Sequence, residues 1–179
     1  MSLSATNPPG TPSADSAAAQ LELRLPDLPA TQRLAERLAA RLEPGFVLFL
    51  SGDLGAGKTT FTRALLRALG YTGRVKSPTF TLLESYELPS FRLYHFDFYR
   101  LSSDRAWLDA GFDDYLGGSG VVVIEWPEHA SASLPAPDLR LRLDFDATAG
   151  DDARTARLDA GSPRGLACLK ALRAAGAAC

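Results

Sequence analysis

Apolar residues along this chain recur with two periods, one typical of strands and the other of helices. Residues 21–25 (LELRL) and 139–145 (LRLRLDF) alternate apolar and polar positions, which predicts half-buried strands. The runs 46–50 (FVLFL) and 121–124 (VVVI) are continuously apolar, which is typical of strands buried on both faces. Because no internal repeat or linker interrupts the pattern, one sheet is expected to contain all the strands.

Helical periodicity separates these strands. Apolar residues spaced four apart predict a helix from about residue 31 to Pro44-Gly45 and another from residue 58 to Gly70. A helix interrupted by glycine is expected over 102–118, and a final helix over 162–175.

Two pairs of strands are expected to form antiparallel hairpins. One strand begins near Phe80, after a loop at Ser77-Pro78, and the short link LPS joins it to a strand over 91–101. The strand 139–145 has its expected partner at 153–160. Helices and hairpins together predict a mixed α/β sheet.

Composition fits one globular domain. The chain has 179 residues, of which 46% are hydrophobic. Residues 1–20 are rich in Ala, Ser, Pro and Thr and are expected to form a disordered tail, which leaves 21–179 as the domain. The tail lacks the apolar core of a signal peptide, and no apolar run is long enough for a membrane span. A cytoplasmic protein without membrane contact is expected.

Charge and metal-ligand content exclude other classes. A net charge of −2 and a pI of about 5.7 argue against a free-standing nucleic-acid binder, so any contact with RNA is expected to be indirect. Cys168 and Cys179 form no C-x-x-C motif, and His95 and His129 are too far apart for a zinc site.

Residues 52–60 (GDLGAGKTT) match the P-loop pattern G-x-x-x-x-G-K-[ST] through Gly52, Gly57, Lys58 and Thr59. The match lies between a predicted strand and a predicted helix, which is the context that the motif requires. Glycines let backbone N–H groups turn toward phosphate oxygens, and the helix N-terminus adds partial positive charge. Lys58 is placed to reach the β- and γ-phosphates and the Thr59 hydroxyl to bind Mg²⁺. A bound nucleoside triphosphate is therefore expected.

Glu125 ends the apolar run VVVI, where a P-loop site needs an acidic group for Mg²⁺ and water. An ordinary charge at a strand end is the alternative, which we consider weaker because only this run combines a long apolar strand with a terminal carboxylate. The neighbouring Trp126 fits a position near the nucleotide or in the core equally well.

Asp97 lies among aromatic residues in YHFDFYR (94–100), where an unpaired carboxylate is costly. Strand alternation places Asp97 on one face with His95, which we interpret as a packed structural histidine. The carboxylate could orient the attacking water or a Mg²⁺ ligand, or it could only pair with Arg92 or Arg100.

Two further features concern turnover and base specificity. Thr79, in the loop KSPTFT (76–81), is a candidate γ-phosphate sensor, although a plain turn hydroxyl explains it as well. The chain has no N-K-x-D motif, since its only Asn is Asn7, and this favours ATP over GTP. Glutamine occurs only at Gln20 and Gln32, so hydrolysis is expected to be slow unless a partner completes the site.

Taken in order, the P-loop, KSPTFTLLESYE, YHFDFYRL and VIEWPE make the chain resemble the TsaE (YjeE) family over residues 21–172. These are small bacterial P-loop ATPases needed to make threonylcarbamoyladenosine in tRNA. The resemblance implies an α/β, P-loop NTPase-like three-layer sandwich with a mixed sheet, in which antiparallel strands flank a parallel core. The segment after YRL is usually rich in Glu in that family, but here it reads SSDRAWLDAGFDDYL, which weakens any inference about a partner surface there.

The resemblance also implies roles for individual residues. Thr59 and Glu125 would bind Mg²⁺, Asp97 would be needed for ATP hydrolysis, and Glu128 would lie close to the nucleotide. The remaining implied residues are those of the nucleotide-binding segment, Gly55, Ala56, Gly57, Lys58, Thr59 and Thr60, and those of a switch-like loop, Ser77, Pro78 and Thr79.

The implied partners are TsaD and TsaB, whose complex transfers the threonylcarbamoyl group to adenosine. The TsaE-like ATPase would dock on that complex and reset it between turnovers, with only indirect contact to tRNA. Two alternatives remain: a small-molecule P-loop kinase, and a binding module whose ATP site is only structural. The arginines within 140–142 and 154–157 could serve a kinase lid, but their alternating positions favour solvated strand faces.

Overall fold

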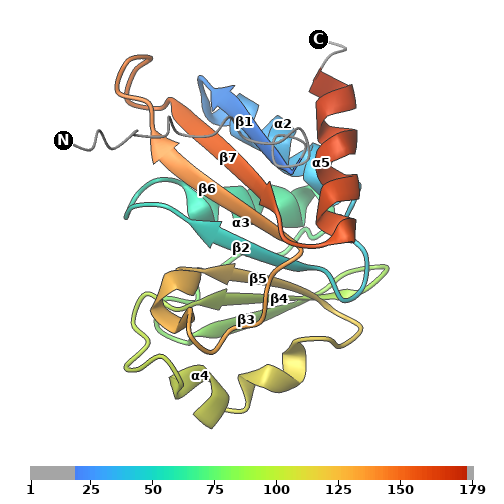
Figure 1. Cartoon of the computed structure of the whole chain (residues 1–179), viewed down its shortest axis with the longest axis vertical. Helices are drawn as coiled ribbons and strands as arrows, with labels where there is room; N and C mark the ends of the chain where they lie inside the picture. Colours follow the sequence, from blue (N-terminus) through green and yellow to red (C-terminus); the bar gives the residue numbers. More distant parts are fainter. Residues whose placement is uncertain (1–18, 177–179) are drawn as a thin grey trace, which may run out of the picture.

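The protein forms one seven-stranded sheet with helices on both faces, as seen in the computed structural model, which describes residues 19–176 (Figure 1). Most of the tail predicted for 1–20 lies outside the described residues, and Gln20 already begins the first strand. The strands are β1 (Gln20–Leu25), β2 (Val47–Ser51), β3 (Leu83–Glu87), β4 (Arg92–Asp97), β5 (Val121–Glu125), β6 (Leu139–Phe145) and β7 (Arg154–Ala160).

The sheet is mixed, as predicted. Its strand order is β1-β7-β6-β2-β5-β4-β3, and the four central strands β6, β2, β5 and β4 run parallel. Both expected hairpins are present, because β3 pairs with β4 and β6 with β7 in antiparallel fashion. The carboxyl ends of β2, β4 and β5 therefore meet at one edge, which is where ligands bind in open α/β sheets.

Three longer helices cover one face of the sheet: α2 (Leu28–Ala39), α3 (Lys58–Ala68) and α5 (Pro163–Gly176). Leu38 of α2, Phe61 and Leu65 of α3 and Leu169 of α5 are all fully buried in one apolar cluster with the inward side chains of the strands. Burial of this kind supplies most of the driving force for folding.

The opposite face has a thinner cover, made of α4 (Ala106–Asp109) and the 3₁₀ segments η1 (Phe112–Tyr115) and η2 (Pro127–Ala130). Trp107 and Ala130 bury against Phe96 and Ile124 of the sheet. The helix predicted over 102–118 is largely wrong, because only α4 and η1 are helical there and turns make up the rest of the segment. The predicted interruption is present at Gly111, which has φ 71° and separates the two.

Several element boundaries differ from the prediction. Helix α2 begins at Leu28 because the Asp27 carboxylate accepts the Ala30 N–H at 2.7 Å, a local cap that leucine spacing alone does not reveal. Strand β3 begins at Leu83 instead of near Phe80, since the Leu82 N–H bonds to the Pro78 carbonyl in a turn with φ 62° at Leu82.

Strand β4 also ends earlier than predicted, at Asp97 instead of residue 101. The Asp97 carboxylate accepts the N–H of Tyr99 at 3.0 Å, and this local bond turns the chain away from the sheet. Across residues 19–176 there is no helix with the length and apolar character needed to span a membrane.

Candidate functional site

The segment between β2 and α3 has the backbone that a phosphate-binding loop requires. Gly52, Gly55 and Gly57 adopt φ values of 132°, 81° and 107°, which side chains with a Cβ rarely tolerate. A Cβ at Gly52 would lie 2.1 Å from the carbonyl oxygen of Leu143. Gly57 is also the N-cap of α3 and has no side chain to cap it, so the first N–H groups of the helix face the loop.

Lys58 is the first residue of α3, and its ammonium group folds back over the loop. Its Nζ donates to the carbonyl oxygens of Gly52 at 2.6 Å and Asp53 at 3.0 Å, and lies 3.8 Å from the ring centroid of Trp126. Trp126 lines the pocket beside Lys58 and also packs against the apolar cluster of Phe96 and Ile124, so it combines features of both positions considered from the sequence. Trp126 reaches this place through a backbone with φ 59°, which is uncommon for a bulky residue.

The electrostatic environment of Lys58 combines burial with several carboxylates. Burial lowers the pKa of Lys58 below its ordinary value. The negative charges of Glu125, Glu128, Asp97 and Asp53 oppose this shift by favouring the ammonium form. An added phosphate would reinforce these carboxylates and favour the charged lysine.

A pocket of about 470 Å³ opens beside Lys58, at the carboxyl ends of β4 and β5. Nine of the predicted site residues line it, together with four others that the prediction did not include as site residues. The predicted residues are Gly55, Gly57, Lys58, Thr59, Thr60, Ser77, Thr79, Asp97 and Glu125, and the additional ones are Leu54, Tyr99, Arg100 and Trp126.

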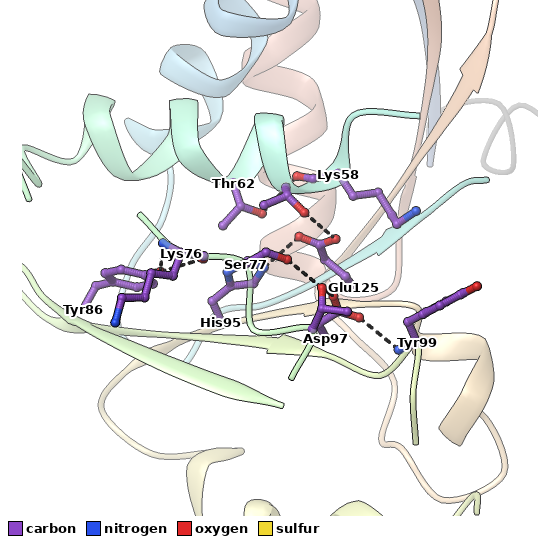
Figure 2. Close-up of polar contacts among 11 residues, drawn as sticks. Lys58, Thr62, Lys76, Ser77, Tyr86, His95, Asp97, Tyr99 and Glu125 are labelled. Carbon is purple, nitrogen blue, oxygen red and sulfur yellow. Dashed lines mark hydrogen bonds and ion pairs between the residues drawn. The ribbon is translucent and has the colours of Figure 1, made fainter. Parts of the chain in front are cut away.

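Glu125 lies between the helix and the sheet and is almost fully buried (Figure 2). Its Oε2 accepts the Thr59 hydroxyl at 3.1 Å, and its Oε1 is 2.8 Å from Nε2 of His95. His95 is fully buried, as expected for a structural histidine, but its contact with Glu125 connects it directly to the site.

The Thr59–Glu125 pair has the donor chemistry that Mg²⁺ prefers. Both contribute oxygen, and their 3.1 Å separation is close to the spacing of roughly 3 Å between adjacent ligands in an octahedron with Mg–O distances of about 2.1 Å. Within the described part of the chain, no group of three or more His, Cys, Asp or Glu side chains could hold a metal ion. A cation at this pair would therefore take its other ligands from phosphate and water.

Asp97 is buried beside Glu125 and contacts the loop that follows residue 76. Its Oδ2 accepts the Thr79 hydroxyl at 2.7 Å, and its Oδ1 accepts the Tyr99 N–H. Neither arginine weighed as its partner pairs with it: Arg92 forms an ion pair with Glu87, and Arg100 lies over the ring of Phe80.

The switch-like loop, residues 77–79, is held at both ends. Before it, Tyr86 donates its hydroxyl to the Lys76 carbonyl at 3.1 Å and accepts the Lys76 N–H at 3.3 Å (Figure 2). At its other end Thr79 bonds to Asp97, and Ser77 lies within hydrogen-bond distance of Thr79 at 2.8 Å. Movement of Thr79 would therefore change the hydrogen bonding of Asp97.

Comparison with known proteins identifies the family. The profile of the TsaE family, described as threonylcarbamoyl adenosine biosynthesis protein TsaE, matches residues 25–156. The chain belongs to the TsaE family. The matched region runs from the end of β1 into β7 and contains every predicted site residue.

Individual TsaE proteins show the same relationship. The tRNA threonylcarbamoyladenosine biosynthesis protein TsaE of Bacillus subtilis is 42% identical over 135 residues, which cover 75% of this chain and 82% of the relative. Its namesake from Haemophilus influenzae is 40% identical over 121 residues, with 68% and 74% covered. The crystal structure of Bacillus subtilis YdiB superposes with a TM-score of 0.74 at 34% identity, covering 88% of this chain and 96% of YdiB.

Four predicted residues of this TsaE site lie outside the pocket lining. The Gly52 carbonyl holds Lys58, and Ala56 and Pro78 are buried within their loops. Glu128 is exposed, lies in η2 and accepts a hydrogen bond of 3.4 Å from the Ser51 hydroxyl. It borders a separate pocket that also includes Arg140. Its proximity to a nucleotide stays a prediction.

Arg154 is a P-loop contact that the sequence interpretation missed. Its Nε donates to the Ala56 carbonyl at 3.0 Å, and its guanidinium lies 4.3 Å from the ring centroid of Phe145. The expectation of a solvated strand face holds only in part for this residue, which is half-buried against the P-loop, whereas it holds for Arg157, which is exposed and pairs with Glu22. Both arginines lie on β7, and no pattern in the sequence distinguishes them.

Proposed function

We propose that this chain binds ATP with Mg²⁺ in the P-loop pocket and hydrolyses it slowly as an accessory ATPase. In this proposal it supports a TsaD–TsaB complex that adds the threonylcarbamoyl group to adenosine next to the anticodon of tRNAs. The main support is that the P-loop, the Thr59–Glu125 pair and Asp97 all line one pocket. Membership of the TsaE family supports the pathway, since the relatives are named for tRNA threonylcarbamoyladenosine biosynthesis.

Phosphate binding would use groups that already converge on the P-loop. The N–H groups at the start of α3 and the Lys58 ammonium would contact the β- and γ-phosphate oxygens. Lys58 now donates to two loop carbonyls, so it would exchange these neutral acceptors for charged ones. Charge-assisted hydrogen bonds are the stronger kind, and this favours the exchange.

Thr59 and Glu125 would hold Mg²⁺, which when bound neutralises charge on the β- and γ-phosphates. Asp97 would orient the attacking water, because it is buried at the pocket and its partners are hydroxyl and amide groups instead of a neutralising arginine. The Thr79 hydroxyl occupies one of its oxygens, so the loop would control how freely Asp97 can accept a proton or a hydrogen bond from water.

A partner-dependent role fits two properties of the chain. No glutamine is among the described residues that line the pocket, so no such side chain is placed to position water there and turnover would stay slow until a partner acts. Its net charge of −2 offers little attraction for tRNA phosphates, so it would contact tRNA only indirectly.

The proposal is tested by measuring phosphate release from ATP by the purified full chain, with and without Mg²⁺ and TsaD–TsaB. We expect slow, Mg²⁺-dependent release that the partners accelerate, and co-purification of the chain with the complex. A panel of metabolites should yield no phosphorylated acceptor. Identical release by the wild type and Asp97→Ala under every condition would favour an inert binding module, and a phosphorylated metabolite would favour a kinase.

A further inference from the structure

From the contacts of His95 we propose that it is a positioning residue for Glu125, and this inference rests on the proposed function. In this arrangement His95 donates an Nε2–H hydrogen bond to Oε1 of Glu125, at 2.8 Å. That bond leaves Oε2 to face Thr59, at 3.1 Å, where the divalent cation would bind. His95 thus holds the side of the carboxylate that the cation does not use.

Strand register brings the two side chains together. Asp97 pairs with Glu125 across the parallel strands β4 and β5, and His95 pairs with Val123. Residues two apart in a strand point to the same face, so His95 and Asp97 both lie on the face covered by α3. Glu125 is directly opposite Asp97 and diagonal to His95, a distance that long side chains can span. Figure 2 shows the imidazole beside the Glu125 carboxylate, below the first turns of α3.

The surroundings of Nδ1, the second imidazole nitrogen, indicate which tautomer of His95 is present. Among residues 19–176, Nδ1 of His95 is the buried side-chain polar atom that has no hydrogen-bond partner. A proton on Nδ1 would be a buried donor without an acceptor, and Nε2 would then point a lone pair at the carboxylate. The Nε2–H tautomer avoids both costs. Among the described residues, Glu125 is therefore the hydrogen-bond partner of the buried imidazole, which donates to it.

Such a contact affects cation binding more than nucleotide binding. Hydrogen bonds to ligating carboxylates fix their orientation, and their loss typically weakens metal affinity or activity by about 10–100-fold. His95 does not line the pocket, so its removal leaves the phosphate contacts of Lys58 and the P-loop in place.

Two substitutions separate this role from simple packing. In His95→Gln the amide nitrogen can take the place of Nε2, whereas in His95→Asn it reaches only the place of Nδ1. Binding of a fluorescent ADP analogue is titrated at increasing Mg²⁺ in the full chain, and Mn²⁺ binding is followed by electron paramagnetic resonance. We expect His95→Asn to raise the half-saturating Mg²⁺ concentration about 10–100-fold, His95→Gln to stay within about threefold of the wild type, and affinity without Mg²⁺ to be unchanged in both.

Equal Mg²⁺ dependence in all three proteins, or equal defects in both variants, would overturn the inference. If the variants do not fold, ¹⁵N NMR of the wild-type histidines decides, because a proton on Nδ1 of His95 contradicts the proposed donor and a proton on Nε2 supports it. If the nucleotide affinity of the wild type does not change with Mg²⁺ concentration, the proposed magnesium site itself is contradicted instead. The two failures are thus distinguishable.

Discussion

Asp97 and Glu125 are register partners at the ends of adjacent parallel strands, and both carboxylates are buried at the same pocket. They nevertheless have separate sets of partners. Asp97 is bonded to the loop through Thr79, and Glu125 is bonded to the helix through Thr59. Each carboxylate therefore accepts a hydroxyl hydrogen bond from a different element of the site. Because their hydrogen-bond partners differ, we propose different roles for the two carboxylates: water positioning for Asp97 and Mg²⁺ binding for Glu125.

Lys58→Ala is expected to weaken ATP binding by about 100-fold or more, because it removes the charged hydrogen bonds that we propose Lys58 makes to the β- and γ-phosphates. Titration of a fluorescent ATP analogue measures the effect. Lys170→Ala, which changes an exposed lysine on α5, is the matched control and should bind normally. Retained affinity in Lys58→Ala would contradict the phosphate contacts.

Asp97→Asn is expected to spare ATP binding and to reduce phosphate release by about 100-fold or more, since the amide cannot accept a proton or attract water as the carboxylate does. Asp109→Asn, at an exposed position on α4, serves as control. Binding and partner-stimulated release are measured on the same samples. If Asp97→Asn loses binding together with turnover, the carboxylate has a structural role in holding Thr79.

Arg154→Ala is expected to weaken ATP binding by roughly tenfold, because loss of its bond to the Ala56 carbonyl loosens the P-loop by about the free energy of one hydrogen bond. Amide hydrogen exchange within 53–57 should become faster. Arg157→Ala, on the same strand but away from the loop, should change neither quantity. Equal effects of the two substitutions would show that only strand stability had changed.

Tyr86→Phe is expected to destabilise the folded protein by about 1 kcal/mol at neutral pH and to speed amide exchange near Lys76, because the hydroxyl bonds both backbone groups of that residue. Chemical denaturation and hydrogen exchange measure the two effects. Tyr115→Phe, which keeps the aromatic contacts of its ring, is the control.

The same substitution is also expected to change how the free energy of unfolding depends on pH. Burial raises the pKa of Tyr86 above 10.0, so the folded state favours the neutral phenol. Its contribution to stability is complete below the unfolded pKa and declines as pH rises through 10 and beyond. The wild type should therefore lose more unfolding free energy than Tyr86→Phe between pH 9 and 11. A parallel decline in both proteins would show that Tyr86 does not titrate differently in the folded state.

Much of the architecture was predictable, because alternating patterns and apolar runs indicate which residues of a strand are buried. The mixed sheet, the two hairpins and the position of Glu125 at the end of β5 all match the prediction. Errors arose where a local side-chain bond overrides periodicity. Asp27 starts α2 early, and Asp97 ends β4 early through its bond to Tyr99.

The amino-acid sequence by itself determined the P-loop, because its glycines, Lys58 and Thr59 lie within one short segment whose backbone and helix start are local properties. Only the tertiary structure decided which distant groups meet it. His95 and Glu125 are 30 positions apart, and Arg154 and Ala56 are 98 positions apart. Such contacts depend on strand order and register, which are set by packing of the whole sheet and its helices instead of by any one segment.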